Sequence, residues 1–312
     1  MRRLVLFFHP GCERNISKYN DGICPSSKDR GHTRKYMVTN GKVLNKDVVQ
    51  CKFGFWGEWE GSSEFTLVKD ILKKKDHPTA IHSKLNLETN EGNFFNTDPC
   101  VMGNMFLYSS YQQNFIADLK ELEVGDILLF GTGKKSFNSR KKNKKVYDIF
   151  ICDTVFVIKY KIENMPTSSL EEFDNAVKSN LKKHKAPKCT IDNFDKLKEW
   201  YYEMNIKCLN NKENAFYIGA TYEDKYKGMF SYIPCKVLDT IDEHGGFERP
   251  DLGPLLKKLP EFKEVREGIK GFGNQNINIK DEVVNKKLFN SIMDYIKEEN
   301  NLDIAVECDF YD

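Results

Sequence analysis

Short apolar stretches broken by polar positions dominate the first 160 residues of the chain. Alternation with a period of two puts every second side chain on one face and is typical of β-strands. The pattern predicts strands at residues 3–8, 47–56, 124–130 and 147–160, a strand or a short helix at 65–75, and a turn at 96–100. We therefore expect a β-rich first half.

The segment RKYMVTNGKVL carries Asn40-Gly41 between two apolar stretches. Asn-Gly is strongly favoured in two-residue hairpin turns, because both positions of such a turn require a positive φ. The sequence therefore predicts a β-hairpin that turns at these two residues.

From residue 161 onward the pattern becomes helical. Ser168 and Glu171 form a capping box in front of an amphipathic segment, and Asp192 is placed to cap a second helix. A helical insertion is therefore expected at 165–205, and strands return within 215–238.

A C-terminal helix is expected at residues 282–298. Val284, Leu288, Ile292 and Ile296 recur every four residues and form one apolar stripe along it. The resulting order of strands, helices, strands and a helix predicts an α+β fold rather than an alternating, doubly wound sheet.

Two regions are expected: a β-rich region at 1–160 that carries the site, and an α+β region at 161–312. The alternative is that both regions pack together as one domain, since the length suits either arrangement.

The 312 residues are 40% hydrophobic and 30% charged, with a formal net charge of +2. This balance is typical of a globular domain and indicates no strongly charged field over the whole chain. The nine cysteines include no C-x-x-C pair, which argues against a disulfide framework and favours a reducing, cytoplasmic location. No apolar run reaches the length of a membrane span, and no motif indicates a metal or a cofactor.

The stretch CKFGFWGEWEG at residues 51–61 combines aromatic rings, glycines and carboxylates. In an extended segment Trp56, Glu58 and Glu60 share one face. We expect a pocket in which Trp56 or Trp59 stacks on a flat ligand while a glutamate accepts hydrogen bonds from it. Paired carboxylates also suit acid–base catalysis. The alternative is an edge strand with its tryptophans in the core and its glutamates in solvent.

Four of the six histidines lie within the first 82 residues. His9 follows the first predicted strand, and His32 lies beside Arg34, a candidate ligand-binding residue. In a catalytic site, His9 and His32 would be the acid–base partners of the glutamate pair. Their spacing does not indicate a zinc site, and His77 and His82 are too far apart for two ligands on one helical face. The alternative is a set of scattered surface or hydrogen-bonded histidines.

A lysine-rich connection between two predicted strands holds seven basic residues and no acid from 134 to 145. Such a loop would attract phosphates without reading bases. The candidate phosphate-binding residues are Lys134, Lys141, Lys142, Lys144 and Lys145. The alternative is a solvated loop.

Tyr217 and Arg249 are further candidate ligand-binding residues. Tyr217 lies in the apolar run FYIGA and suits a pocket wall. Arg249 precedes Pro250, which favours an extended backbone and a fixed guanidinium. The alternative for Arg249 is a surface ion pair with a neighbouring acid.

Residues 122–158, which include LEVGDILLFGTG and IFICDTVFVI, resemble the central strands of PUA-like barrels such as the ASCH, EVE and YTH-type domains. The resemblance rests on Gly125 and Asp126 at the opening of a strand. It implies a partly barrel-like, antiparallel β core and binding of nucleic acid with one base in an aromatic pocket, for which Trp56 and Trp59 would be suited. The segments WGEWE and NTDP also resemble bacterial and phage proteins linked to nucleotide modification or defence.

Three functions are consistent with these patterns. The first is binding of a nucleotide, a modified base or nucleic acid through an aromatic and carboxylate pocket. The second is an enzyme that acts on a nucleotide-like substrate by Glu/His acid–base chemistry. The third is a protein–protein interaction module in which the aromatics are core residues.

Replacement of Lys141, Lys142, Lys144 and Lys145 by Ala is expected to weaken binding to single-stranded oligonucleotides. With each phosphate contact that is lost, fewer counterions are released from the nucleic acid on binding. Affinity should be measured at several salt concentrations, and the salt slope should fall with it. Unchanged affinity with an unchanged slope would show that the loop is only a solvated connection.

Overall fold

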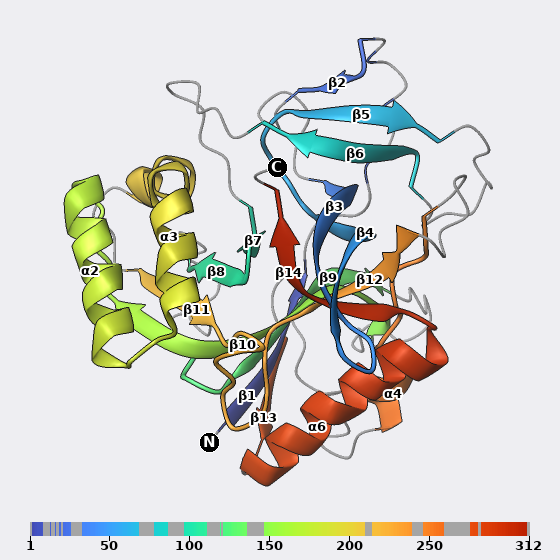
Figure 1. Ribbon diagram of the computed structural model, residues 1–312. Coiled ribbons are helices and arrows are strands. Elements are labelled where there is room, and N and C mark those ends of the chain that lie inside the picture. Colours follow the sequence, from blue (N-terminus) through green and yellow to red (C-terminus); the bar gives the residue numbers. More distant parts are fainter. Residues whose placement is uncertain are drawn as a thin grey trace.

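The computed structural model describes residues 2–8, 13, 16, 19, 21–25, 33–68, 78–86, 97–110, 119, 121–135, 147–209, 214–238, 246–258, 275–279 and 282–310. Within these ranges, only the backbone is described for residues 133–135, 147–149, 208 and 275–279. Its strands form two sheets with helices against them (Figure 1).

The first sheet has seven strands in the order β13-β1-β9-β10-β11-β8-β7. β1 and β9 pair in parallel, whereas the other neighbours pair antiparallel. The strands are Gln275–Ile279 (β13), Arg2–Phe8 (β1), Ile127–Lys135 (β9), Tyr147–Glu163 (β10), Ala215–Gly219 (β11), Met105–Ser109 (β8) and Cys100–Met102 (β7).

The second sheet also has seven strands, in the order β14-β12-β4-β3-β6-β5-β2, and β14 pairs with β3 as well. Only β3 and β6 pair in parallel among its described strands. The strands are Asp303–Asp309 (β14), Ile233–Val237 (β12), Val48–Glu58 (β4), Arg34–Leu44 (β3), Ala80–Leu85 (β6), Ser63–Leu67 (β5) and Ile23–Cys24 (β2).

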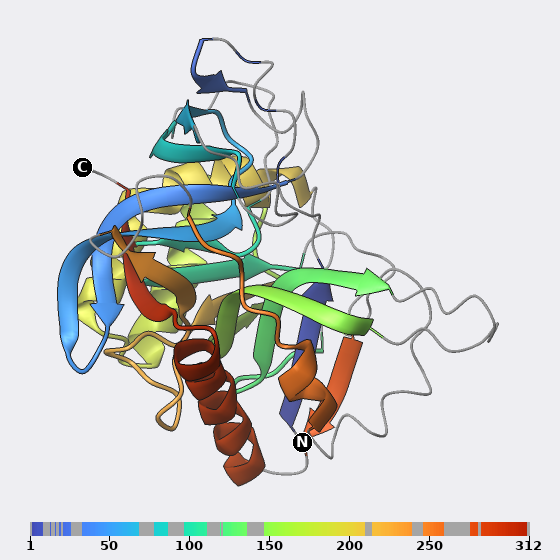
Figure 2. The same ribbon diagram turned by 90° about the vertical axis from the view of Figure 1, so that its right-hand side faces the viewer.

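Two groups of helices flank the sheets. Helix α2 (Leu170–Lys183) lies beside α3 (Lys188–Tyr201), which continues into a π-helical turn (Tyr202–Ile206) and a 3-10 turn (Lys207–Leu209). Helix α6 (Glu282–Asp294) ends in a π-helical turn (Tyr295–Glu299), and a short α4 spans Gly253–Lys258. Figure 1 shows α6 well apart from α2 and α3, and in the turned view of Figure 2 α6 is in front while α2 and α3 lie behind the sheets.

The expected α+β class with mostly antiparallel strands is confirmed, but the described strands do not form a closed barrel. Each sheet combines strands from both halves of the chain, as in the pairs β10–β11 and β4–β12. The boundary expected after residue 160 falls inside β10. Strand β14, which follows the C-terminal helix, was not expected from the pattern.

Strand β10 is buried on both faces and separates two cores. Phe156 and Ile158 belong to the core that contains α2 and α3, here called the α2–α3 core. Val155 and Val157 belong to the core that contains α6, here called the α6 core. Since successive side chains of a strand point to opposite faces, an apolar run without alternation is what such a strand requires.

The hairpin turn predicted at Asn40-Gly41 is wrong. Both residues lie within β3, which runs on to Leu44 before the chain turns at 45–47 into β4. A Cβ atom on Gly41 would lie 2.0 Å from the backbone oxygen of Glu307 in β14. The glycine is therefore required by the close approach of a distant strand and not by a turn.

The helical insertion is confirmed, but its cap lies one residue later than predicted. The N-cap of α2 is Ser169, whose hydroxyl accepts the backbone N–H of Glu172 at 3.2 Å. Ser168 with Glu171 and Ser169 with Glu172 both have the capping-box spacing, so the local pattern alone does not distinguish the two registers.

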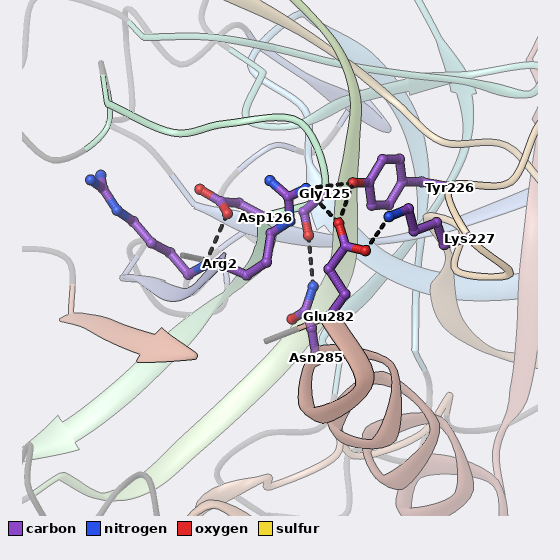
Figure 3. A network of polar contacts seen from close by, with 8 residues as sticks. Arg2, Gly125, Asp126, Tyr226, Lys227, Glu282 and Asn285 are labelled. Carbon is purple, nitrogen blue, oxygen red and sulfur yellow. Dashed lines mark hydrogen bonds and ion pairs between the residues drawn. The ribbon is translucent and has the colours of Figure 1, made fainter. Parts of the chain in front are cut away.

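Gly125 and Asp126 form a junction between β1, β10 and α6 (Figure 3). The two carboxylate oxygens of Asp126 accept the backbone N–H groups of Arg3 and Glu123, each at 2.9 Å. The side-chain amide of Asn285 donates to the Gly125 carbonyl at 2.8 Å. Burial raises the pKa of Asp126, and these backbone N–H groups oppose the rise.

A charged group at the start of α6 adjoins this junction. The Glu282 carboxylate pairs with Lys227 and with Arg2, and these contacts lower the pKa of Glu282 to about 2. The hydroxyl of Tyr226 also donates to it, at 3.1 Å (Figure 3). A carboxylate in the first turn is favoured by the helix dipole.

Replacement of Gly125 by Ala is expected to destabilise the fold by more than the same change at Gly22. Both glycines have a positive φ, +93° and +71°, which costs an alanine about 1–2 kcal/mol. A Cβ atom at Gly125 would also lie 2.4 Å from the Tyr226 ring, whereas at Gly22 its nearest neighbour is 3.5 Å away. Urea denaturation of both variants gives the difference in their free energies of unfolding. Equal losses of stability would show that the contact with Tyr226 is unimportant.

Candidate functional site

A small, partly enclosed cavity lies against the end of β4. Its volume is about 20 Å³, which is room for one water molecule. The walls are mainly apolar, and Glu58, Thr97 and Thr154 supply polar groups. The other lining residues are Met37, Phe55, Gly57, Trp59, Leu85, Pro99, Cys100, Val101, Met102, Ile233 and Phe310. We call this space the Glu58 cavity.

Three aromatic side chains line the Glu58 cavity. The rings of Phe55 and Phe310 have centroids 5.9 Å apart. Trp59 stacks on Trp200 of α3, with centroids 5.3 Å apart and planes inclined by 5°. This stacking holds Trp59 in one orientation, because one face of its ring is already covered.

Glu58 is buried at the polar end of the cavity. Its Oε2 accepts the backbone N–H of Asp98 at 2.7 Å. Arg34 is the register partner of Glu58 on β3, and its Nη1 lies 3.8 Å from the same oxygen. The same Nη1 donates to the Asp98 carbonyl at 3.1 Å. The loop at Asp98 is thus held by groups from two neighbouring strands.

Asp153 joins the two arginines of the site. Its Oδ2 lies 2.7 Å from Nε of Arg34 and 3.4 Å from Nη1 of Arg249. Arg249 also lies over the ring of Trp56, 5.4 Å from its centroid, in cation–π geometry. The register of β10 against β9 shifts between Cys152 and Thr154, so Asp153 lies at a β-bulge.

Burial dominates the electrostatics of this network. It raises the pKa of Asp153, while Arg34 and Arg249 oppose the rise and the nearby Glu58 carboxylate adds to it. Nη2 of Arg34 and Oδ1 of Asp153 have no hydrogen-bond partner within the described part of the chain. A donor and an acceptor therefore remain for a ligand or a water molecule.

The structure brings together several residues that the sequence selected. Glu58 and Trp59 line the cavity, and Arg34 and Arg249 lie in the adjoining network. Trp56 also contacts this network but belongs to the α6 core, where its Nε1 donates to the Phe247 carbonyl at 2.8 Å.

Other selected residues are placed differently. Glu60 is buried but is not among the described residues that line the cavity. Tyr217 of β11 lies in the α2–α3 core, where its hydroxyl donates to the Leu119 carbonyl at 2.6 Å and its ring stacks on Tyr108. Trp56 and Glu60 were expected to share the pocket face with Glu58, but both faces of β4 are buried from Phe53 onward.

Several predictions fall on residues that the structure does not describe: His9, His32, Lys141, Lys142, Lys144 and Lys145. Lys134 is described only through its backbone in β9. The catalytic and phosphate-binding roles given to these residues remain predictions.

Asp98, Asp153 and Phe310 were not selected from the sequence. Asp153 is the one acid within the apolar run IFICDTVFVI. A buried carboxylate requires a partner, so its position alone indicated a paired cation. Phe310 carries no such signal, because it follows a strand that the pattern did not predict.

The chain matches no known family model, no curated protein and no solved structure. Among the described residues, no helix has both the length and the apolar character needed to cross a membrane.

Replacement of Asp153 by Asn is expected to lower the free energy of unfolding by about 3–5 kcal/mol, because the buried Arg34 guanidinium loses the nearer of its two counter-charges and Arg249 loses a carboxylate partner. Glu64→Gln is the matched control, since it breaks the exposed ion pair with Lys84, whose atoms are 2.8 Å apart. The control should cost less than about 1 kcal/mol. If denaturant titrations gave equal losses of stability for Asp153→Asn and Glu64→Gln, the buried pair would not be important for stability.

Proposed function

We propose that the protein binds a planar, nitrogen-containing ligand of the nucleobase class in the Glu58 cavity, as a nucleotide, a modified base or part of a nucleic acid. One observation carries the proposal: the walls of an apolar, aromatic-lined cavity include the buried Glu58 carboxylate, which lies 3.8 Å from Arg34, and Asp153 links Arg34 to Arg249. An apolar pocket with a few convergent polar groups is the usual form of a small-molecule site.

The aromatic walls suit the faces of a base, and Glu58 suits its edge. Phe55, Trp59 and Phe310 offer flat apolar surfaces, which bases use for stacking. A carboxylate accepts hydrogen bonds from exocyclic amino or ring N–H groups but cannot donate when ionised. Glu58 would therefore select a ligand edge that presents donors.

Binding of a base requires the cavity to widen. At about 20 Å³ the cavity accommodates a water molecule and not a ring. Met37 and Met102 line it, and methionine side chains adapt their shape at low cost. Phe310, which lies just after β14, is only partly buried. We expect these side chains to move when the ligand enters.

The arginine network supports a ligand that carries phosphate. Arg34 and Arg249 are both buried, and Arg34 retains a donor nitrogen without a partner among the described residues. A guanidinium held in one orientation matches the geometry of phosphate oxygens. The PUA-like resemblance of residues 122–158 implies a base-binding role of the same kind and belongs to this proposal.

Calorimetric titration with a panel of bases, nucleosides, nucleotides and short oligonucleotides tests the proposal. Wild type should bind at least one class, and Glu58→Gln should weaken that binding about 10- to 100-fold, which corresponds to roughly 1–3 kcal/mol for one hydrogen bond to a charged acceptor. Glu64→Gln, an exposed change on β5, is the matched control and should bind like wild type.

Two results would contradict the proposal. One is the absence of binding to every member of the panel by folded wild type, and the other is equal affinity of wild type and Glu58→Gln. Chromatography of the incubated panel runs alongside the titrations. Product formed by wild type but not by Glu58→Gln would replace ligand binding by the enzyme hypothesis.

A further inference from the structure

A second buried polar cluster lies where the N-terminal segment meets β2 and β6. Glu13, Cys24 and His82 place a carboxylate oxygen, a thiol sulfur and an imidazole nitrogen within 4.8 Å of one another. Their side chains are buried, and they come from three separate segments of the chain. The backbone N–H of Glu13 donates to the Arg34 carbonyl at 2.9 Å, which holds Glu13 against β3.

We propose that Glu13, Cys24 and His82 bind one zinc ion. Zinc is a borderline-soft ion that takes thiolate, imidazole and carboxylate ligands together, whereas magnesium and calcium require sets of oxygen atoms. The three donors occupy three positions of a tetrahedral ion and leave one for a fourth ligand.

Two of the three separations between donor atoms are near those of a zinc site, and all three are within 4.8 Å. Zinc lies about 2.3 Å from sulfur and about 2.0–2.1 Å from nitrogen or oxygen, so tetrahedral ligands are roughly 3.3–3.6 Å apart. Sγ of Cys24 is 3.6 Å from Oε1 of Glu13, and Nε2 of His82 is 2.8 Å from Oε2 of Glu13. A small rotation of the Glu13 carboxylate would admit the ion.

The second nitrogen of His82 is held in the manner of a metal ligand. Its Nδ1 lies 2.9 Å from the hydroxyl oxygen of Ser63, which Nζ of Lys35 also approaches at 3.4 Å. A hydrogen bond from Nδ1 to an outer partner orients a ligating imidazole and leaves Nε2 for the metal. Zinc binding would therefore select the tautomer with the proton on Nδ1.

Charge balance and packing favour an ion here. A thiolate and a carboxylate neutralise the two charges of zinc, so the occupied centre carries no net charge into the interior. Among the described residues, the buried members of the surrounding apolar cluster are Ile16, Cys24, Phe65 and Ala80. A metal that joins Glu13 and the two-residue strand β2 to β6 would add to the stability of this part of the fold.

Metal analysis and cobalt substitution of the full chain test the proposal. Purified protein should contain one zinc per chain, and after chelation it should bind Co²⁺ with a thiolate-to-cobalt band in the near ultraviolet. Cys24→Ser should lose that band, whereas Cys189→Ser, a change at an exposed cysteine in α3, should keep it. Ser63→Ala should weaken zinc affinity about 10- to 100-fold by loosening His82.

A second readout does not depend on a variant that folds. Nitrogen NMR of wild-type His82 should show the proton moving from Nε2 to Nδ1 when zinc is added to the chelated protein. Folded wild type that takes up no zinc, a cobalt spectrum without a thiolate band, or a band that survives in Cys24→Ser would each overturn the proposal. These measurements involve no nucleotide, so they succeed or fail independently of the Glu58 cavity.

Discussion

The buried ion pair between Arg34 and Asp153 links the two sheets. Arg34 opens β3 of the second sheet, and Asp153 lies in β10 of the first, with 2.7 Å between Nε and Oδ2. Removing one partner of such a pair leaves an uncompensated charge, at a cost of about 3–5 kcal/mol. The contact therefore constrains how the sheets meet and where the groups around it lie.

The Glu58 cavity depends on this constraint. Arg34 also approaches Glu58 and binds the Asp98 carbonyl, so the pair that joins the sheets orients the polar end of the cavity as well. A low-dielectric setting strengthens hydrogen bonds to a ligand and penalises unpaired groups. In the proposed function, this arrangement is what would let the cavity select between ligand edges.

Two consecutive residues of β3 serve the two polar centres of the protein. Arg34 enters the network beside Glu58, while Lys35 reaches the Ser63 hydroxyl next to His82. Adjacent side chains of a strand point to opposite faces, so one short segment supports both the proposed ligand site and the proposed zinc site. A shift of β3 by one residue would move one of the two cations into the place of the other and disrupt both centres.

The sequence by itself determined the elements whose signal is local. The stripe of Leu288, Ile292 and Ile296 predicted the C-terminal helix, and the apolar run of 147–160 predicted β10, because a 3.6-residue repeat and a continuous apolar run are both local signals. Glu58, Arg34 and Arg249 were selected by residue type and neighbours. Only the tertiary structure decided that Gly41 lies under β14, that Trp56 faces a second core, and that Asp153 and Phe310 belong to the site. Those contacts join residues far apart along the chain, and no local periodicity encodes which distant strands will meet.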